Sequence, residues 1–135
     1  AADRGIDIIQ TRCQDSTQPV CEFTETADFV LADVPCSGLG VLKRKPEIKY
    51  KGCEELPELI ERQRKILQAA AGYVKPGGIL VYSTCTINPD ENEKQTEHFL
   101  AGNPEFQEIF HRQLLPCDET DGFFICRMKK VNDIE

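Results

Sequence analysis

The stretch Phe29-Val-Leu-Ala-Asp-Val-Pro-Cys36 decides the fold expected of this chain. An apolar run that ends beside Asp33 and is closed by Pro35 is typical of a buried parallel strand leading into a functional loop. Ligands bind at the carboxyl ends of such strands in open α/β sheets. We therefore expect Asp33 and Cys36 to lie at a ligand-binding edge.

A helix and a second strand follow this stretch. Apolar residues recur at helical spacing from Pro57 to Val74, which predicts an amphipathic helix that packs on the sheet. Lys75-Pro-Gly-Gly78 is expected to stop this helix, and Ile79–Cys85 is predicted to be the next strand. A strand-helix-strand crossover makes its two strands parallel. Cys36 and Cys85 should therefore share one rim of the sheet.

The flanking segments are predicted to extend the sheet. β-Branched residues predict a strand over Ile6–Cys13, which would bring Asp15 to the ligand edge. Phe106–Leu114 and Gly122–Lys129 are predicted to form an antiparallel hairpin at the edge of the sheet.

A further helix is expected to begin at Pro89, with Asn88 as its cap, and to end near Ala101. Three acids lie at its start, and we interpret them as capping charges without a catalytic role. They are Asp90, Glu91 and Glu93.

The composition is that of one soluble domain, or part of one. The chain has 135 residues, of which 40% are hydrophobic and 29% charged. It lacks a run of about 18 apolar residues, so we expect no membrane span. The N-terminus lacks the pattern of a signal peptide, and a cytoplasmic location is expected.

Seven cysteines at irregular spacing favour a reduced cytosolic protein over a disulfide scaffold. No Cys-x-x-Cys occurs, and neither histidine stands at zinc-finger spacing from a cysteine pair, so no metal site is expected. We interpret Cys13, Cys21 and Cys126 as buried packing residues. Cys53 and Cys117 lie in loop-like stretches.

The charge is distributed unevenly. The net charge of −7 argues against general attraction to nucleic acid, yet residues 43–51 carry a local charge of +4. This basic island is interpreted either as an RNA contact, with basic groups on phosphates and a tyrosine for stacking, or as an ordinary solvated loop. Its candidate RNA-binding residues are Lys43, Arg44, Lys45, Lys49, Tyr50 and Lys51.

Three motifs carry a family resemblance. They are Asp-Val-Pro-Cys-Ser-Gly-Leu-Gly (33–40) with Arg-Lys-Pro-Glu-Ile-Lys-Tyr (44–50), Ser-Thr-Cys-Thr-Ile-Asn-Pro-Asp-Glu-Asn-Glu (83–93), and Asp-Gly-Phe-Phe (121–124). From about Ile6 to Lys129 the chain resembles the RNA 5-methylcytosine methyltransferases, and the Sun/Fmu group that methylates small-subunit ribosomal RNA most of all. The resemblance implies a Rossmann-like α/β fold, a mostly parallel sheet with an antiparallel edge hairpin, and S-adenosylmethionine as cofactor.

The resemblance also implies roles for individual residues. Cys85 would be the nucleophile that adds to cytosine C6, because C5 is not nucleophilic enough to take a methyl group directly. Cys36 would act in product release, and Asp33 would bind the base edge and stabilise the adduct. Asp15, Asp33 and Pro35 would contact the cofactor. The target base would have to leave its stack.

Part of the family's domain is missing from the sequence. No glycine-rich cofactor loop and no ribose-binding acid precede Ile6, so the chain is interpreted as the C-terminal portion of the catalytic domain. In the family's sheet the absent strands would lie between the strand at Ile6 and the strand at Phe29. The unpaired backbone groups of this gap would favour a rearranged sheet or a homo-oligomer joined through the exposed edge.

Three other functions stay open on the sequence. The chain could be a catalytically silent module that retains RNA contact. It could be a thiol redox protein that uses Cys36 and Cys85, although it lacks Cys-x-x-Cys. Finally, Cys36 rather than Cys85 could be the nucleophile, as in DNA cytosine-C5 methyltransferases, which use a Pro-Cys nucleophile.

Overall fold

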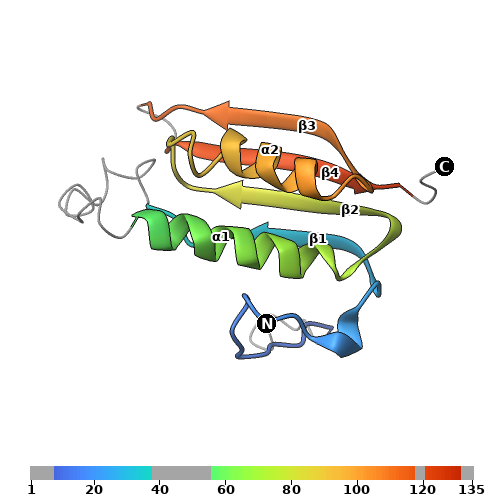
Figure 1. Cartoon of the computed structure of the whole chain (residues 1–135). Coiled ribbons are helices and arrows are strands. Elements are labelled where there is room, and N and C mark those ends of the chain that lie inside the picture. Colours follow the sequence, from blue (N-terminus) through green and yellow to red (C-terminus); the bar gives the residue numbers. More distant parts are fainter. Residues whose placement is uncertain (1–7, 38–55, 118–120, 132–135) are drawn as a thin grey trace.

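A four-stranded mixed sheet forms the centre of the computed structural model, and two helices lie against one of its faces (Figure 1). The structure describes residues 8–37, 56–117 and 121–131. Among these residues the strand order is β1-β2-β4-β3. The sheet contains β1 (Ala27–Asp33), β2 (Val74–Thr84), β3 (Phe106–Leu114) and β4 (Phe123–Lys130).

The crossover from β1 to β2 is formed as the sequence predicts. β1 and β2 are parallel, with Asp33 opposite Ser83, and the intervening helix α1 spans Leu56–Ala71. This helix ends earlier than its apolar periodicity predicts, because Val74 already belongs to β2. Lys75-Pro-Gly-Gly78 was expected to lie between helix and strand, but it forms the first part of β2 instead.

The C-terminal hairpin is confirmed. β3 and β4 are antiparallel, β4 also pairs antiparallel with β2, and β3 lies at the edge of the sheet. The described sheet thus joins one parallel pair of strands to two antiparallel pairs. The predicted α/β class and the antiparallel edge hairpin are confirmed, but the described sheet is mixed rather than mostly parallel, because β4 runs antiparallel to both β2 and β3.

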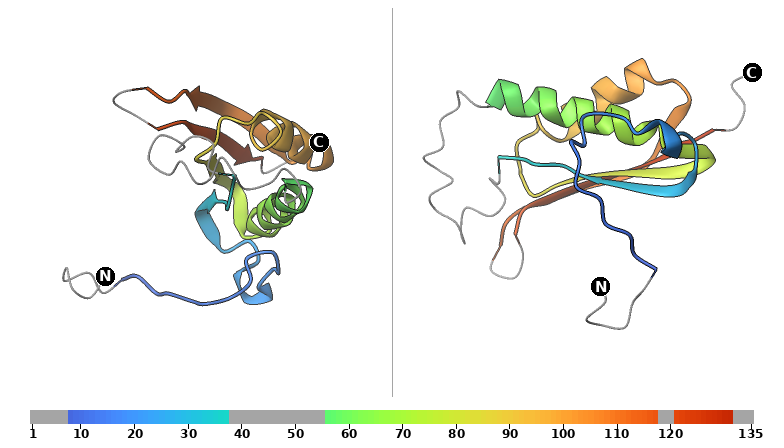
Figure 2. Two further views of the ribbon diagram at one scale, coloured as in Figure 1. Left: turned by 90° about the vertical axis from the view of Figure 1, so that its left-hand side faces the viewer. Right: turned by 90° about the horizontal axis from the view of Figure 1, so that it is seen from below.

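The hydrophobic core lies between the sheet and its two helices, α1 and α2 (Glu93–Gly102). Both views of Figure 2 show the helices on the same face of the sheet. Because side chains alternate along a strand, alternate residues of the two interior strands, β2 and β4, point into this core. Fully buried examples are Leu80, Tyr82, Phe124, Cys126 and Met128.

The opposite face of β1 is open to solvent. The prediction of a buried strand is wrong here, because Phe29 and Leu31 are 59% and 58% exposed. The strand predicted over Ile6–Cys13 is not formed in its described part, residues 8–13. A strand requires a hydrogen-bonded neighbour, and within the described residues β1 pairs only with β2. β-Branched composition alone therefore did not make this segment a strand.

Gly78 lies where the chain passes close to its own backbone. A Cβ atom at this position would stand 2.9 Å from the carbonyl oxygen of Asp28 and 2.8 Å from Cγ1 of Val74. Gly78→Ala is therefore expected to lower the free energy of unfolding by about 1–3 kcal/mol, measured by urea denaturation.

Gly102 provides the matched control for this substitution. It ends α2, and a Cβ atom there would meet nothing within 4 Å. Gly102→Ala should leave stability unchanged or raise it by up to about 1 kcal/mol, because alanine favours the helix. Equal destabilisation by both substitutions would contradict the close approach at Gly78.

A candidate active site of two thiols

Two cysteine side chains meet at the carboxyl ends of β1 and β2. Cys36 follows β1 by three residues, and Cys85 directly follows β2. Their sulfur atoms are 3.1 Å apart, and the backbone N–H of Cys85 donates to Sγ of Cys36 at 3.3 Å. Both side chains are half-buried. The parallel crossover thus places both thiols at one rim of the sheet.

Asp33 ends β1 at the same rim. It lies opposite Ser83 in the sheet, and the Ser83 hydroxyl donates to Oδ1 of Asp33 at 2.9 Å. Ala32 is buried toward the helices, so strand alternation directs Asp33 toward the open face of the sheet, where it is exposed. A carboxylate that is accessible from solvent therefore accompanies the thiols.

A buried carboxylate lies behind the thiols. Glu91 is 0% exposed, and its side chain accepts four hydrogen bonds from three segments of the chain. Oε1 accepts from the backbone N–H of Ser37 at 2.8 Å and from Nε2 of Gln63 at 3.0 Å. Oε2 accepts from the hydroxyl of Ser37 at 2.7 Å and that of Thr86 at 3.2 Å.

The interpretation of Glu91 as a simple capping charge is therefore wrong. α2 begins at Glu93 rather than at Pro89, and its N-cap is Asn92. Asn88 does not cap this helix but accepts a hydrogen bond from the N–H of Asp90 in the preceding turn. The sequence offered only one signal of this role, the closeness of Glu91 to the Ser-Thr-Cys-Thr motif.

Further buried side chains hold the turn after β2. Asn92 accepts from the hydroxyl of Thr84 at 2.6 Å and donates to the carbonyl oxygen of Thr86 at 2.9 Å. It also donates to Oε1 of Gln113 on β3 at 2.7 Å. The turn that carries Cys85 is therefore connected to the hairpin as well as to α2.

Tyr82 supports the same turn from the core. Its hydroxyl donates to the carbonyl oxygen of Glu91 at 2.6 Å. Burial raises the pKa of Tyr82, and the nearby Glu91 and Cys36 raise it further. Tyr82 therefore stays a neutral donor at physiological pH.

The two remaining candidate cofactor contacts lie in different surroundings. Pro35 is exposed in the loop after β1, and its carbonyl oxygen accepts from Nε2 of Gln63 at 2.9 Å. Asp15 does not follow a strand as predicted but lies in an exposed turn before the short helix η2 (Cys21–Phe23). The hydroxyl and backbone N–H of Thr17 donate to the Asp15 carboxylate and lower its pKa.

The predicted RNA-binding residues 43–45 and 49–51 lie outside the described residues. The structure therefore does not place the basic island relative to the thiols. Its proposed role stays a prediction from the sequence.

The other described cysteines differ in exposure. Cys126 is buried as predicted, and burial, assisted by the nearby Glu108, raises its pKa to about 12. The prediction is wrong for Cys13 and Cys21, which are exposed because no strand covers their segment. Since the thiolate is the reactive form of cysteine, Cys126 is held in its unreactive state.

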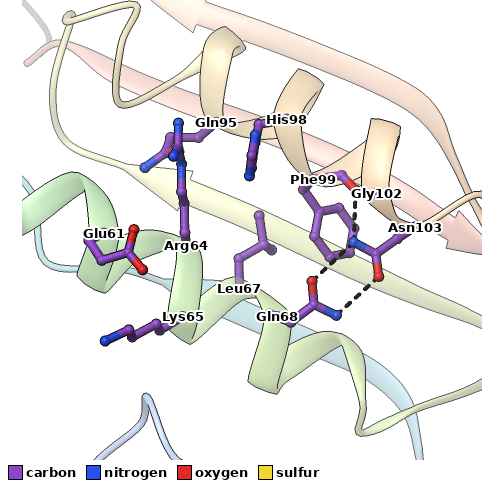
Figure 3. Close-up of a pocket in the computed structure, with 10 residues that line it drawn as sticks. All are labelled: Glu61, Arg64, Lys65, Leu67, Gln68, Gln95, His98, Phe99, Gly102 and Asn103. Atoms are coloured by element: carbon purple, nitrogen blue, oxygen red, sulfur yellow. Dashed lines mark hydrogen bonds between the residues drawn. The ribbon is translucent and has the colours of Figure 1, made fainter.

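A groove of about 300 Å³ lies between α1 and α2 (Figure 3), and neither Cys36 nor Cys85 lines it. Leu67 and Phe99 contribute its apolar lining. Gln68 and Asn103 bridge the two helices with a pair of amide hydrogen bonds of 3.0 and 3.1 Å. The two side-chain amides at this end of the groove are thus bonded to each other. We interpret the groove as part of the packing between the two helices.

The described part of the chain has neither a metal-binding cluster nor a membrane-spanning helix. It contains no group of three or more His, Cys, Asp or Glu side chains arranged to hold a metal ion. None of its helices combines the length and apolarity that crossing a bilayer requires.

Solved structures define the class of this fold. The crystal structure of PH0851 matches with a TM-score of 0.76 and 35% identity, over 79% of this chain and 27% of that one. A methyltransferase homologue from Pyrococcus horikoshii matches with a TM-score of 0.64 and 28% identity, over 77% of this chain and 39% of that one. The fold is thus a portion of a Rossmann-like methyltransferase fold.

The chain belongs to the 16S rRNA methyltransferase RsmB/F family, whose model matches residues 4–129. It is 40% identical to the probable ribosomal RNA small subunit methyltransferase B of Bacillus subtilis, over 96% of this chain and 34% of that protein. The chain therefore spans about a third of the length of this relative. The family resemblance noted in the motifs around Cys36 and Cys85 is confirmed.

Proposed function

We propose that this chain is a portion of the catalytic domain of an enzyme that methylates cytosine C5 in RNA. The target is ribosomal RNA, in keeping with the names of its relatives, and the enzyme acts in the cytoplasm. The observation that carries the proposal is the contact between two thiols at the carboxyl ends of adjacent parallel strands, beside the accessible carboxylate of Asp33. Such an edge is where ligands bind in α/β folds.

The two thiols supply complementary steps of the proposed reaction. Cys85 forms a bond from sulfur to C6 of cytosine, which makes C5 nucleophilic. After C5 is methylated, its proton must leave, and the sulfur–C6 bond must break to restore the ring. Cys36 lies 3.1 Å from Cys85 and acts in this release. Two thiols in contact suit a reaction in which the Cys85 sulfur is bonded to C6 while the Cys36 thiol assists the breaking of that bond.

Asp33 would orient the base. Oδ1 of its carboxylate accepts from Ser83, and the exposure of the side chain lets it also accept from the exocyclic amine or a protonated N3 of the cytosine. A negative charge at this position stabilises the positive charge that develops on the ring. Asp33 would thus bind the adduct more strongly than the free base.

S-adenosylmethionine would supply the methyl group when bound. The described residues fit this cofactor in part, because Asp33 ends the parallel strand β1 and the exposed Pro35 follows it, at the edge where such ligands bind. Asp15 accepts hydrogen bonds from Thr17 in its turn and retains an exposed carboxylate. We assign the methyl-donor side of the cofactor site to Asp33 and Pro35, and its adenine side to Asp15.

Calorimetry and product analysis test the proposal together. S-adenosylmethionine is titrated into the 135-residue chain and into a chimera in which this chain replaces the matching segment of the Bacillus subtilis relative. Both proteins are then incubated with a 16S rRNA transcript, and the nucleosides are analysed by mass spectrometry. We expect 5-methylcytidine from the chimera. A folded, cofactor-binding chimera that forms no 5-methylcytidine, or that methylates another base, would overturn the proposal.

A catalytically silent RNA-binding module is the second candidate. It is favoured by the local charge of +4 at residues 43–51 in a chain that covers about a third of its relative. The same titrations separate it from the first proposal. Salt-sensitive RNA binding by the 135-residue chain, without cofactor binding, would support this module and confine methyl transfer to the longer enzyme.

A further inference from the structure

We propose that Glu91 is a positioning residue that holds Cys36 against Cys85. It does not touch the base or the cofactor in this scheme but acts through the backbone segments that carry the two thiols. The catalytic consequence of this inference rests on the proposed roles of Cys36 and Cys85. The positioning itself is a property of the folded chain.

Because Glu91 is fully buried, its hydrogen bonds are needed to stabilise the carboxylate in the folded chain. A carboxylate removed from water is costly unless donors replace its hydration. All four donors to Glu91 are uncharged, and together they saturate both of its oxygens. Hydrogen bonds to a charged acceptor are shorter and stronger than neutral ones. The loss of this carboxylate would therefore release all the donor segments at once.

The donors are the immediate neighbours of the thiols. Ser37 follows Cys36, and Thr86 follows Cys85, and both hydroxyls donate to the same oxygen of Glu91. These hydroxyl oxygens also lie 3.0 Å from each other. One carboxylate oxygen thus links the loop after β1 to the turn after β2, at positions one residue beyond each sulfur.

Gln63 on α1 completes the arrangement from the other side of Cys36. Its Nε2 donates both to Glu91 and to the carbonyl oxygen of Pro35, so Cys36 is held through the residues before and after it. Nε2 of Gln95 donates to Oε1 of Gln63 at 3.0 Å and fixes the orientation of that amide. α1 and α2 therefore both support the position of the Cys36 loop.

The rate of disulfide formation between Cys36 and Cys85 measures this positioning directly. Diamide takes two electrons and two protons from the two thiols, which form the sulfur–sulfur bond, and is itself reduced to the hydrazine. The linked peptide, lighter by two hydrogens, is quantified by mass spectrometry. In the protein used for this test, serine replaces four other cysteines, and the buried Cys126 is kept. The replaced residues are Cys13, Cys21, Cys53 and Cys117.

Glu91→Ala is expected to slow this reaction on the order of 10- to 100-fold, because the two sulfurs lose their enforced contact. Ser37→Ala, which removes one donor and keeps the carboxylate, should give a smaller reduction. Glu91→Gln should also fall between the wild-type chain and Glu91→Ala, since its amide retains one acceptor oxygen. These milder variants decide the matter if Glu91→Ala does not fold.

Asp90→Asn is the matched control. Asp90 neighbours Glu91 but is partly exposed and pairs with Lys94 at 2.9 Å, so its substitution should leave the rate unchanged. Thermal melting monitored by circular dichroism identifies the variants that are folded at the assay temperature. Wild-type oxidation rates in folded Glu91→Gln and Ser37→Ala, or in folded Glu91→Ala, would overturn the inference.

The assay contains neither RNA nor S-adenosylmethionine, so its result does not depend on the proposed function. If disulfide formation is slowed in the variants but the chimera produces no 5-methylcytidine, Glu91 still positions the two thiols, and the thiols serve a function other than cytosine methylation. If the chimera is active and oxidation is unaffected by these substitutions, the proposed function stands and the role given to Glu91 fails.

Discussion

Cys85→Ala is expected to abolish methyl transfer in the chimera, with a loss on the order of 1,000-fold or more in kcat. The physical reason is that, in the proposed mechanism, the Cys85 thiol forms the bond to C6 that activates C5. Cys36→Ala should behave differently, because attack by Cys85 remains possible while release is impaired. This variant is expected to accumulate a covalent complex with RNA, visible as a slower band on a denaturing gel.

RNA that contains 5-fluorocytosine separates the roles of the two thiols. Fluorine at C5 cannot leave as a proton, so the sulfur–C6 bond persists after methylation and the enzyme is trapped. We expect the trap in the unmodified chimera and its loss in Cys85→Ala. Cys13→Ser, a change at an exposed thiol, serves as the control. A trap that survives Cys85→Ala and disappears in Cys36→Ala would exchange the two roles.

Phe124→Ala is expected to lower the free energy of unfolding by about 3–5 kcal/mol. Phe124 is 0% exposed on the interior strand β4, and its ring packs edge-on against Tyr82 with centroids 6.4 Å apart. Its removal leaves a cavity beside the strand that leads to Cys85. Denaturant unfolding monitored by circular dichroism measures this loss.

Phe123→Ala is the paired control for the core substitution. Phe123 precedes Phe124 on the same strand but points to the opposite face, where it is only half-buried. Its truncation should cost about 1 kcal/mol. Equal costs at the two positions would show that the helix-covered face is not the main core of the domain.

The sequence predicts the centre of this fold well because the signals there are local. The helical periodicity between Pro57 and Val74 reflects the face that α1 buries. The apolar run at Phe29 marks the position of β1, although Phe29 and Leu31 themselves are exposed. The connection of these elements then requires parallel strands and brings Cys36 to Cys85. This geometry follows from chain direction alone, so no knowledge of side-chain contacts was needed.

The failed predictions concern features that depend on distant partners. The segment at Ile8 has strand-forming residues, but strand formation depends on a neighbouring strand. α2 starts after Glu91 and Asn92 because their side chains bond to Ser37, Thr84 and other residues of the site. The burial of Glu91 was likewise hidden, since three of its four hydrogen bonds come from segments at least 28 residues away along the chain.

The position of β4 in the sheet constrains when the domain can fold during its synthesis. Among the described strands β4 comes last along the chain, yet it lies between β2 and β3. A nascent chain that has emerged only as far as Gln113 lacks the strand that pairs with β2, so backbone groups of Ile79–Thr84 have no partner on that side. Such an incomplete chain is prone to aggregate. Completion of the core must therefore wait until Lys130 has left the ribosome.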